Sequence, residues 1–359
     1  MLPSVLPTFG CLTRPRRPSK RMELGVSDPE MTLGDCGEHQ LIERLRLYCA
    51  PSMIGDDAAV FTPPHDQQMV FSTDVLVDGV HFSLGMASPV VTMTPFDVGW
   101  RAAAANLSDI AAMGATPIGM TVGMAAPSHC PVAVIEDIYQ GLAACCHTYG
   151  TAIFGGDTCR SGVLSLSISI LGAAPPERLI YRHTARPGDL ILATGLHGAA
   201  RAGLECLLQP EWAATVPTEL RQLWVHAHQH PQPRLDVVQW LWQQSPAPRV
   251  SGMDSSDGLA DAVLQICAAS GVGAILSAEA IPKLPYLDPE QALAWALYGG
   301  EDFELVLCLP PAIAPDLCAM AGNHAAILGE ITATPEVLLQ QGKTLRPLQH
   351  QHTFQHFSR

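Results

Sequence analysis

Two hydrophobic periods alternate along the chain and predict a mixture of helices and strands. Residues 94–114 have apolar positions at helical spacing, with Thr94 before them, proline at the first helical position and glycine after the last. Residues 131–150 likewise begin with proline and end with glycine, so both segments are predicted to be helices. Residues 68–82 are rich in β-branched and apolar side chains and run into a polar turn, which predicts a strand. Two more strands are expected at 151–157 and 163–172.

The same alternation repeats in the second half of the chain. Strand or helix patterns occur at 190–195, 198–208, 256–271 and 302–309. A proline-rich, charged stretch at 174–189 separates the halves and is the expected boundary. We therefore predict a two-domain α/β fold of the α+β type, with mixed sheets packed by helices, divided into residues 34–176 and 177–359.

The first thirty residues lack such a pattern. They contain many prolines and basic residues, and they have no long apolar core of a signal peptide. We expect residues 1–33 to form an extension that is either disordered or non-native, lying in the second case upstream of a real start at Met22 or Met31.

Composition and charge narrow the class of protein. The 359 residues are 48% hydrophobic, which allows a large core, and the net charge of −14 argues against nucleic acid as a partner. No apolar run is long enough to span a membrane. The eleven cysteines lack disulfide or metal spacing, so we expect reduced thiols in a cytoplasmic enzyme. Only 15% of residues are charged, so the position of each acid is informative.

Acids recur beside small residues at the expected ends of elements. Six segments share this design: 55–57, 72–74, 106–109, 155–157, 253–258 and 299–302. Each alone is typical of a turn, and the serines and aspartates of 253–258 are also typical of a helix N-cap. If the acids converge, they need cations, because two charges 4 Å apart repel by about 4 kcal/mol near a protein surface. Carboxylates and hydroxyls are Mg²⁺ ligands, and several Mg²⁺ ions indicate a polyphosphate such as ATP.

Other motifs are absent or ambiguous. There is no P-loop and no protein-kinase signature, so a nucleotide would be held through metal ions. Two histidine-rich segments, 224–233 and 348–357, are read either as metal sites or as solvated polar segments.

Seven motifs resemble the thiamine-monophosphate kinase family, in the same order, over residues 34–357. They are "IGDDAAV", "STDVLVDGVHF", "GWRAAAANLSDIAAMGATP", "FGGDTCRS", "ARPGDLILATG", "MDSSDGLADAV" and "YGGEDFELVL". The resemblance implies the fold of the aminoimidazole ribonucleotide synthetase-like superfamily. It also implies ATP-dependent phosphorylation of thiamine monophosphate to thiamine diphosphate, the last step of thiamine diphosphate biosynthesis. Residues 34–176 would bind ATP and Mg²⁺ and form a homodimer.

The resemblance assigns roles position by position. The implied Mg²⁺ ligands are Asp57, Ser72, Thr73, Asp74, Asp109, Asp157, Asp254 and Asp257. The implied nucleotide contacts are Gly156, Asp157, Arg182 and Ser256, and the implied catalytic residues are Asp74, Asp109 and Asp157. His81 and Glu301 correspond to contacts with thiamine monophosphate. Relatives carry an aromatic residue near the C-terminus, usually tryptophan, which the tail of this chain lacks; Phe354 or a neighbouring histidine is its expected substitute.

The implied chemistry needs alignment and charge neutralisation more than a base. The acceptor is a phosphate whose second pKa is close to 6, so it is largely ionised at neutral pH and direct transfer is expected without a phosphoenzyme. Other members of the superfamily are disfavoured, because the cysteines expected of selenophosphate synthetase and of the hydrogenase-maturation protein are missing. A metal-dependent phosphohydrolase and a Ca²⁺-binding scaffold are alternatives from other classes.

Overall fold

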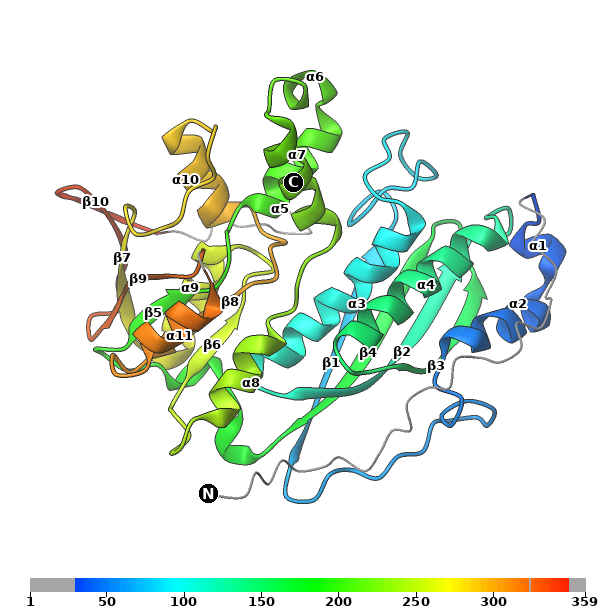
Figure 1. Cartoon of the computed structure of the whole chain (residues 1–359), viewed down its shortest axis with the longest axis horizontal. Helices are drawn as coiled ribbons and strands as arrows, with labels where there is room; N and C mark the ends of the chain where they lie inside the picture. The colour runs from blue at the N-terminus through cyan, green and yellow to red at the C-terminus, as the bar shows by residue number, and fades with distance from the viewer. Residues whose placement is uncertain (1–29, 323, 349–359) are drawn as a thin grey trace, which may run out of the picture.

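The computed structural model describes residues 30–322 and 324–348 as two β-sheets, each covered by helices (Figure 1). Most of the expected extension, and Phe354, lie outside the described residues. Thr32 and Leu33, at the end of that extension, are described: Thr32 caps the first helix with its side chain.

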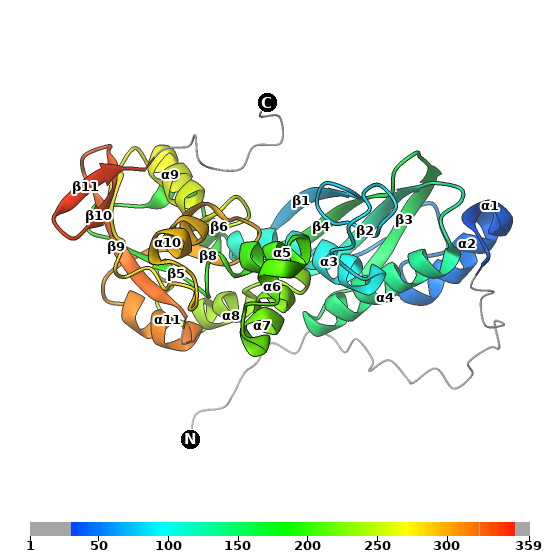
Figure 2. The same cartoon turned by 90° about the horizontal axis from the view of Figure 1, so that it is seen from above.

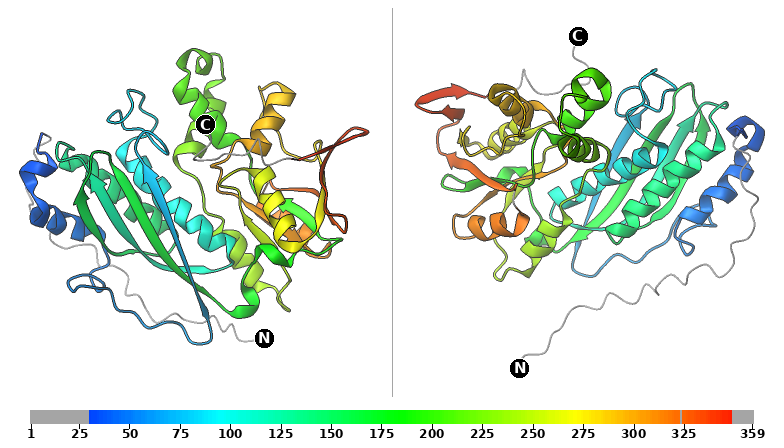
Figure 3. Two further views of the ribbon diagram at one scale, coloured as in Figure 1. Left: turned by 180° about the vertical axis from the view of Figure 1, so that it is seen from behind. Right: turned by 45° about the horizontal axis from the view of Figure 1, so that its top comes forward.

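The N-terminal half is built on a four-stranded mixed sheet in the order β1-β4-β2-β3. The β2–β3 pair is parallel and the other two pairs are antiparallel. The strands are β1 Gln68–Val77, β2 Thr116–Ala126, β3 Ile153–Arg160 and β4 Ser165–Ala174. The helices are α1 Leu33–Cys36, α2 Glu38–Leu45, α3 Pro95–Ala112 and α4 Val132–Thr148. In the described part of the chain, helices α3 and α4 cover one face of the sheet and no helix covers the other (Figure 3).

The two predicted helices of this half are confirmed as α3 and α4. Thr94 and Asp97 form a reciprocal capping box at the start of α3, which satisfies backbone N–H groups that lack helical partners. The two helices pack closely because each presents a glycine to the other. A Cβ on Gly99 would overlap the Ile138 carbonyl, and one on Gly141 would overlap the Phe96 carbonyl.

The C-terminal half is built on a seven-stranded mixed sheet in the order β11-β10-β7-β9-β5-β8-β6. The strands are β5 Leu190–Ala193, β6 Ser251–Asp254, β7 Gly273–Ser277, β8 Leu305–Leu309, β9 Ala326–Thr332, β10 Val337–Gln341 and β11 Thr344–Pro347. The helices are α5 Ala199–Leu208, α6 Pro210–Ala213, α7 Thr218–Gln229, α8 Leu235–Gln243, α9 Leu259–Ser270, α10 Pro289–Tyr298 and α11 Ala314–Ala321. The predicted two-sheet α/β architecture is confirmed.

Helix α3 joins the two halves. It lies on the N-terminal sheet and its last turns reach the edge strand β6, as the view from above shows (Figure 2). One apolar cluster runs across this junction, from Leu107 of α3 to Leu235 of α8 and Leu307 of β8. The halves therefore share a core, and the residues at the end of α3 are held against the C-terminal half.

Several acid-bearing segments lie inside elements and not at their ends, which corrects the prediction. Residues 72–74 are in the middle of β1, residues 155–157 continue within β3, and residues 106–109 precede the end of α3.

The expected side-chain cap on α9 is also wrong. That helix begins at Leu259 after Gly258, and no side chain caps it. Ser256 instead donates to Asp254 Oδ1 (3.3 Å), so these polar groups are available for another role.

The histidine-rich segment 224–233 is neither a flexible solvated strip nor a metal cluster. Most of it forms the end of α7. His228 is buried, and His230 pairs with Asp97 of α3 through Nε2 and Oδ1 (2.6 Å). No group of three or more metal-binding side chains was found within residues 30–322 and 324–348. Of the second segment, only Leu348 is described.

Candidate active site

A cleft of about 590 Å³ lies where β1, α3 and the start of α5 face the loops after β6 and α10. Eight of the residues assigned from the sequence line it: Thr73, Asp74, His81, Asp109, Asp254, Ser256, Asp257 and Glu301. They come from both halves of the chain. The cleft therefore depends on the packing of α3 against the C-terminal sheet.

Three carboxylates meet at one end of the cleft, from three different elements. Asp74 lies on β1, Asp109 on α3 and Asp254 at the end of β6. Ser72 donates to Asp109, and Ser108 donates to Asp254 Oδ2 (3.0 Å). We call Asp74, Asp109 and Asp254 the acid trio.

Burial and mutual repulsion make the acid trio hard to ionise. Burial, followed by the charge of Asp109, raises the pKa of Asp74 to about 6. Burial, Asp109 and Asp74 together raise the pKa of Asp254 to about 7, although Ser108 and Ser256 oppose the shift. Burial also raises the pKa of Asp109, against the lowering effects of Ser72 and Arg182. Such shifts are typical of groups that are held together for a function.

The cleft is also lined by Arg101, His81 and Glu301. Arg101 is almost completely buried on α3, and its guanidinium lies 2.7 Å from Glu301 Oε1. The backbone N–H of Val77 donates to His81 Nδ1 (3.1 Å), which places the ring proton of the neutral imidazole on Nε2. Arg101 and Asp109 are eight residues apart on one helix, so their backbone positions are separated by about 12 Å along α3.

The remaining assigned acids lie elsewhere. Asp57, Gly156 and Asp157 line a second hollow of about 690 Å³, which follows the helix-free face of the N-terminal sheet and its β3 edge. Strand pairing places Asp74 and Gly156 in one row, with Ile168 and Val122 between them. Three strand spacings separate them by about 14 Å. The single ligand set expected from the sequence is thus divided between two places.

Three of the residues assigned from the sequence make packing or hydrogen-bond contacts within the protein itself. A Cβ on Gly156 would overlap the Val122 carbonyl, so close packing of β3 on β2 requires this glycine without any ligand. The Thr73 hydroxyl donates to the Ile168 carbonyl (2.8 Å), away from the acid trio. Arg182 donates to Gln265 Oε1 (2.6 Å). Its charge also lowers the pKa of Asp109, so it lies within electrostatic range of the trio.

Comparisons with known proteins agree with this geometry. The family model of the AIR synthase related protein N-terminal domain matches residues 55–174, and that of the C-terminal domain matches residues 186–340. The thiamine-monophosphate kinase of Synechococcus elongatus is 48% identical over 92% of this chain and 99% of its own length. The chain belongs to the thiamine-monophosphate kinase family.

Solved structures of the family have the same fold. The thiamine-monophosphate kinase of Stenotrophomonas maltophilia superposes with a TM-score of 0.72 at 29% identity, over 83% of this chain and 95% of the other. The structure of AaThiL complexed with AMPPCP and TMP gives a TM-score of 0.66 at 27% identity, over 91% and 99%. The predicted fold and family are confirmed.

Two cleft residues were missed by the sequence reasoning: Arg101 and Phe303. Asp302 is buried and accepts hydrogen bonds from the backbone N–H groups of Gly198 (2.7 Å) and Ala200 (2.9 Å) at the start of α5. Asp302 ends the acid-bearing segment 299–302 and Phe303 adjoins it, which was a usable signal. Arg101 had none, because a single basic residue in an apolar helix carries no spacing motif.

Proposed function

We propose that this chain transfers the γ-phosphoryl group of ATP to the phosphate of thiamine monophosphate and so forms thiamine diphosphate. The observation that carries the proposal is the acid trio, three mutually repelling carboxylates in a cleft that is also lined by His81 and Glu301. A relative with this activity in its name matches nearly the whole chain at 48% identity. The structure named as a complex with AMPPCP and TMP has the same fold.

The donor atoms of the acid trio fit Mg²⁺, which prefers carboxylate, hydroxyl and water oxygens. We propose that Asp74, Asp109 and Asp254 hold Mg²⁺ together with Ser72 and Asp257. The described residues contain no compact group that encloses an ion by itself. This agrees with ions that take their remaining ligands from phosphates and water. When bound, Mg²⁺ would neutralise the charge of the reacting phosphates.

The residues of the chain contribute alignment to the transfer. An acceptor phosphate at the acid trio is already largely ionised near neutral pH, so no side chain is required as a base. We propose that His81 Nε2–H donates to a hydrogen-bond acceptor of thiamine monophosphate. Arg182, whose charge lowers the pKa of Asp109, is the proposed contact of the nucleotide phosphates. Because donor and acceptor oxygens can be aligned directly, we propose transfer without a phosphoenzyme.

The expected product is thiamine diphosphate from thiamine monophosphate, ATP and Mg²⁺, detected by chromatography. Unphosphorylated thiamine should be a far poorer acceptor, because it lacks the ionised phosphate that the proposed Mg²⁺ ions would hold at the acid trio. ADP formation without an acceptor should be negligible. Release of phosphate at the same rate with and without thiamine monophosphate would instead indicate a phosphohydrolase.

We also propose a cytoplasmic homodimer. The helix-free face of the N-terminal sheet exposes an apolar row on β1: Met69 (39% exposed), Phe71 (67%) and Val75 (52%). Exposed apolar rows of this kind are typical of interfaces. A second copy on this face would also enclose the hollow that contains Phe71, Asp57 and Asp157.

A cytoplasmic location agrees with two findings in the described part: its cysteines are all free, and none of its helices is long and apolar enough to cross a bilayer.

A Phe71→Glu variant should be monomeric by light scattering, because it places a charge in the centre of the apolar row. If the second copy completes the nucleotide hollow, the KM for ATP should rise in parallel. Leu345→Glu is the matched control, since Leu345 is 51% exposed on β11 of the other sheet. A wild-type protein that is monomeric at micromolar concentration would contradict the dimer.

A further inference from the structure

The turn that carries Glu301 has a strained backbone. Between α10 and β8, Gly300, Glu301 and Phe303 all adopt positive φ angles, +67°, +60° and +53°. This region is accessible to glycine but costs about 1 to 2 kcal/mol for a residue with a side chain. Two such residues in one short turn need contacts that hold them in place.

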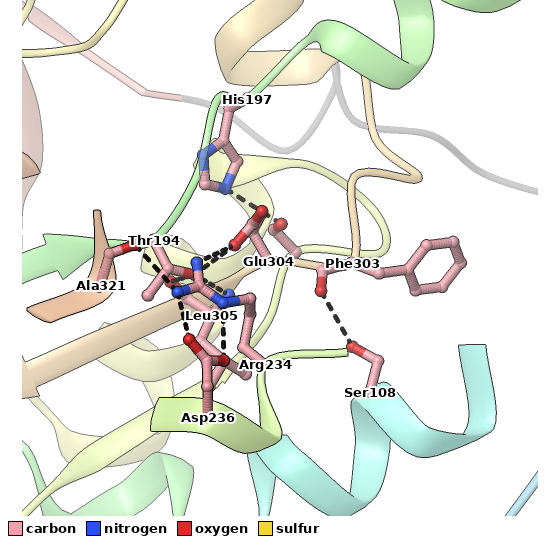
Figure 4. A network of polar contacts seen from close by, with 10 residues as sticks. Ser108, Thr194, His197, Arg234, Asp236, Phe303, Glu304, Leu305 and Ala321 are labelled. Carbon is pink, nitrogen blue, oxygen red and sulfur yellow. Dashed lines mark hydrogen bonds and ion pairs between the residues drawn. The ribbon is translucent and has the colours of Figure 1, made fainter. Parts of the chain in front are cut away.

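Part of the support comes from the backbone and from the polar groups beneath the turn. The N–H of Glu301 donates to the Ser256 carbonyl (2.6 Å), and Asp302 is fixed at the start of α5. Below the turn, Arg234 donates to Glu304 Oε2 (2.9 Å), and Thr194 donates to the same carboxylate (2.6 Å) (Figure 4). These contacts position the main chain, but they do not contact the side chains of Glu301 or Phe303.

Arg101 contacts the side chains of both strained residues. Its guanidinium lies 2.7 Å from Glu301 Oε1 on one side, and on the other it lies over the Phe303 ring at 5.5 Å from the ring centroid. Its remaining contact is a hydrogen bond to the His228 carbonyl near the end of α7. With only 1% of the residue exposed, this cation depends on these partners to offset its desolvation.

We propose that Arg101 is a positioning residue for the acceptor, which fixes the Glu301 carboxylate and the Phe303 ring where they line the cleft. This inference rests on the proposed function for the identity of the acceptor. Thiamine monophosphate carries a cationic ring, which a carboxylate and an aromatic face can both attract. Arg101 orients these two groups and does not contact the reacting phosphates, because Asp109 is about 12 Å away along α3.

The test compares Arg101→Met with Arg178→Met in the full-length enzyme. Arg178 is the control because it is likewise an arginine that donates to backbone carbonyls, those of Leu241 (2.7 Å) and Gln244 (2.9 Å), and it lies outside the cleft. In Arg101→Met, the KM for thiamine monophosphate should rise by about tenfold or more, while kcat and the KM for ATP change by less than about threefold. Arg101→Lys should recover part of the loss, since it restores the charge without the planar fork.

Two further measurements separate positioning from a general structural role. In a Glu301→Gln background, Arg101→Met should raise the acceptor KM by much less than it does alone, because the two residues act through one contact. An equal rise in both backgrounds, or an equal rise in the KM for ATP, would overturn the proposal.

Crystal structures of Arg101→Met and Arg178→Met should differ in the turn, with Glu301 leaving the left-handed region only in Arg101→Met. An unchanged turn in Arg101→Met refutes the positioning role, whatever the acceptor is. Failure of the wild type to phosphorylate thiamine monophosphate refutes the proposed function separately, because the structural comparison does not depend on it.

Discussion

An Asp109→Asn variant is expected to lose at least about a hundredfold in kcat, the largest effect on turnover of any single change considered. Asp109 lies at the centre of the acid trio: its charge raises the pKa of both Asp74 and Asp254. Removing this carboxylate removes a proposed Mg²⁺ ligand from the point where the two phosphates would meet. The measurement is kcat for thiamine diphosphate formation at saturating Mg²⁺ and both substrates.

The loss should not reflect unfolding. Asparagine keeps the shape of the side chain and can still accept a hydrogen bond from Ser72, and its neutrality relieves repulsion within the trio. The melting temperature without Mg²⁺ should therefore stay the same or rise. Asp137→Asn on α4 is the control, because Asp137 is exposed and distant from the cleft. Near-normal kcat in Asp109→Asn would show that the acid trio is not the reaction centre.

The second large effect concerns stability and pH. Without Mg²⁺, the Asp254 carboxyl should destabilise the folded protein progressively as the pH rises from about 4 to about 7. In the unfolded chain this group loses its proton near its ordinary value of 3.8, whereas in the folded protein it keeps the proton until about pH 7. Above about pH 7 this loss of unfolding free energy no longer changes with pH. At 1.36 kcal/mol for each pH unit, the gap between the two pKa values corresponds to a loss of about 4 kcal/mol.

An Asp254→Asn variant is therefore expected to melt several degrees above the wild type at pH 8 without Mg²⁺, and at nearly the same temperature at pH 4. The difference between the two proteins isolates Asp254 from the other titrating groups. Adding Mg²⁺ should raise the melting temperature of the wild type more than that of the variant, because the ion favours the ionised carboxylates. If the variant is the less stable protein at pH 8 without Mg²⁺, Asp254 is not a repelled carboxylate.

The clustering of the acid trio has opposite consequences for stability and for activity. Gathering Asp74, Asp109 and Asp254 at one end of the cleft reduces the stability of the folded protein, and it creates the cation affinity that the proposed reaction requires. Substitutions that remove the repulsion are expected to stabilise the fold while abolishing activity. Such a trade-off between stability and activity is typical of functional sites, whose residues are not optimal for stability.

The sequence by itself determined the elements whose signals are local. Thr94 and the following proline mark the start of α3, and glycines mark the ends of α3 and α4, because caps and turns depend on a few neighbouring residues. The ordered motifs were also sufficient to predict the family and the two-sheet fold. Local patterns failed where an acid beside glycine or serine was read as a turn. Residues 155–157 continue β3, because pairing with β2 overrides the turn preference.

Only the tertiary structure decided which of the assigned residues share a site. Asp254 meets Ser108 across 146 positions of sequence, and this contact exists because β6 is the edge strand that packs against α3. Strand order likewise separates Asp74 from Gly156 and Asp157, which the motifs alone had placed in one ligand set. The contact of Arg101 with Glu301 depends on the packing of α3 against a turn with left-handed backbone. Distances of this kind follow from the register and packing of remote segments, which spacing along the chain does not encode.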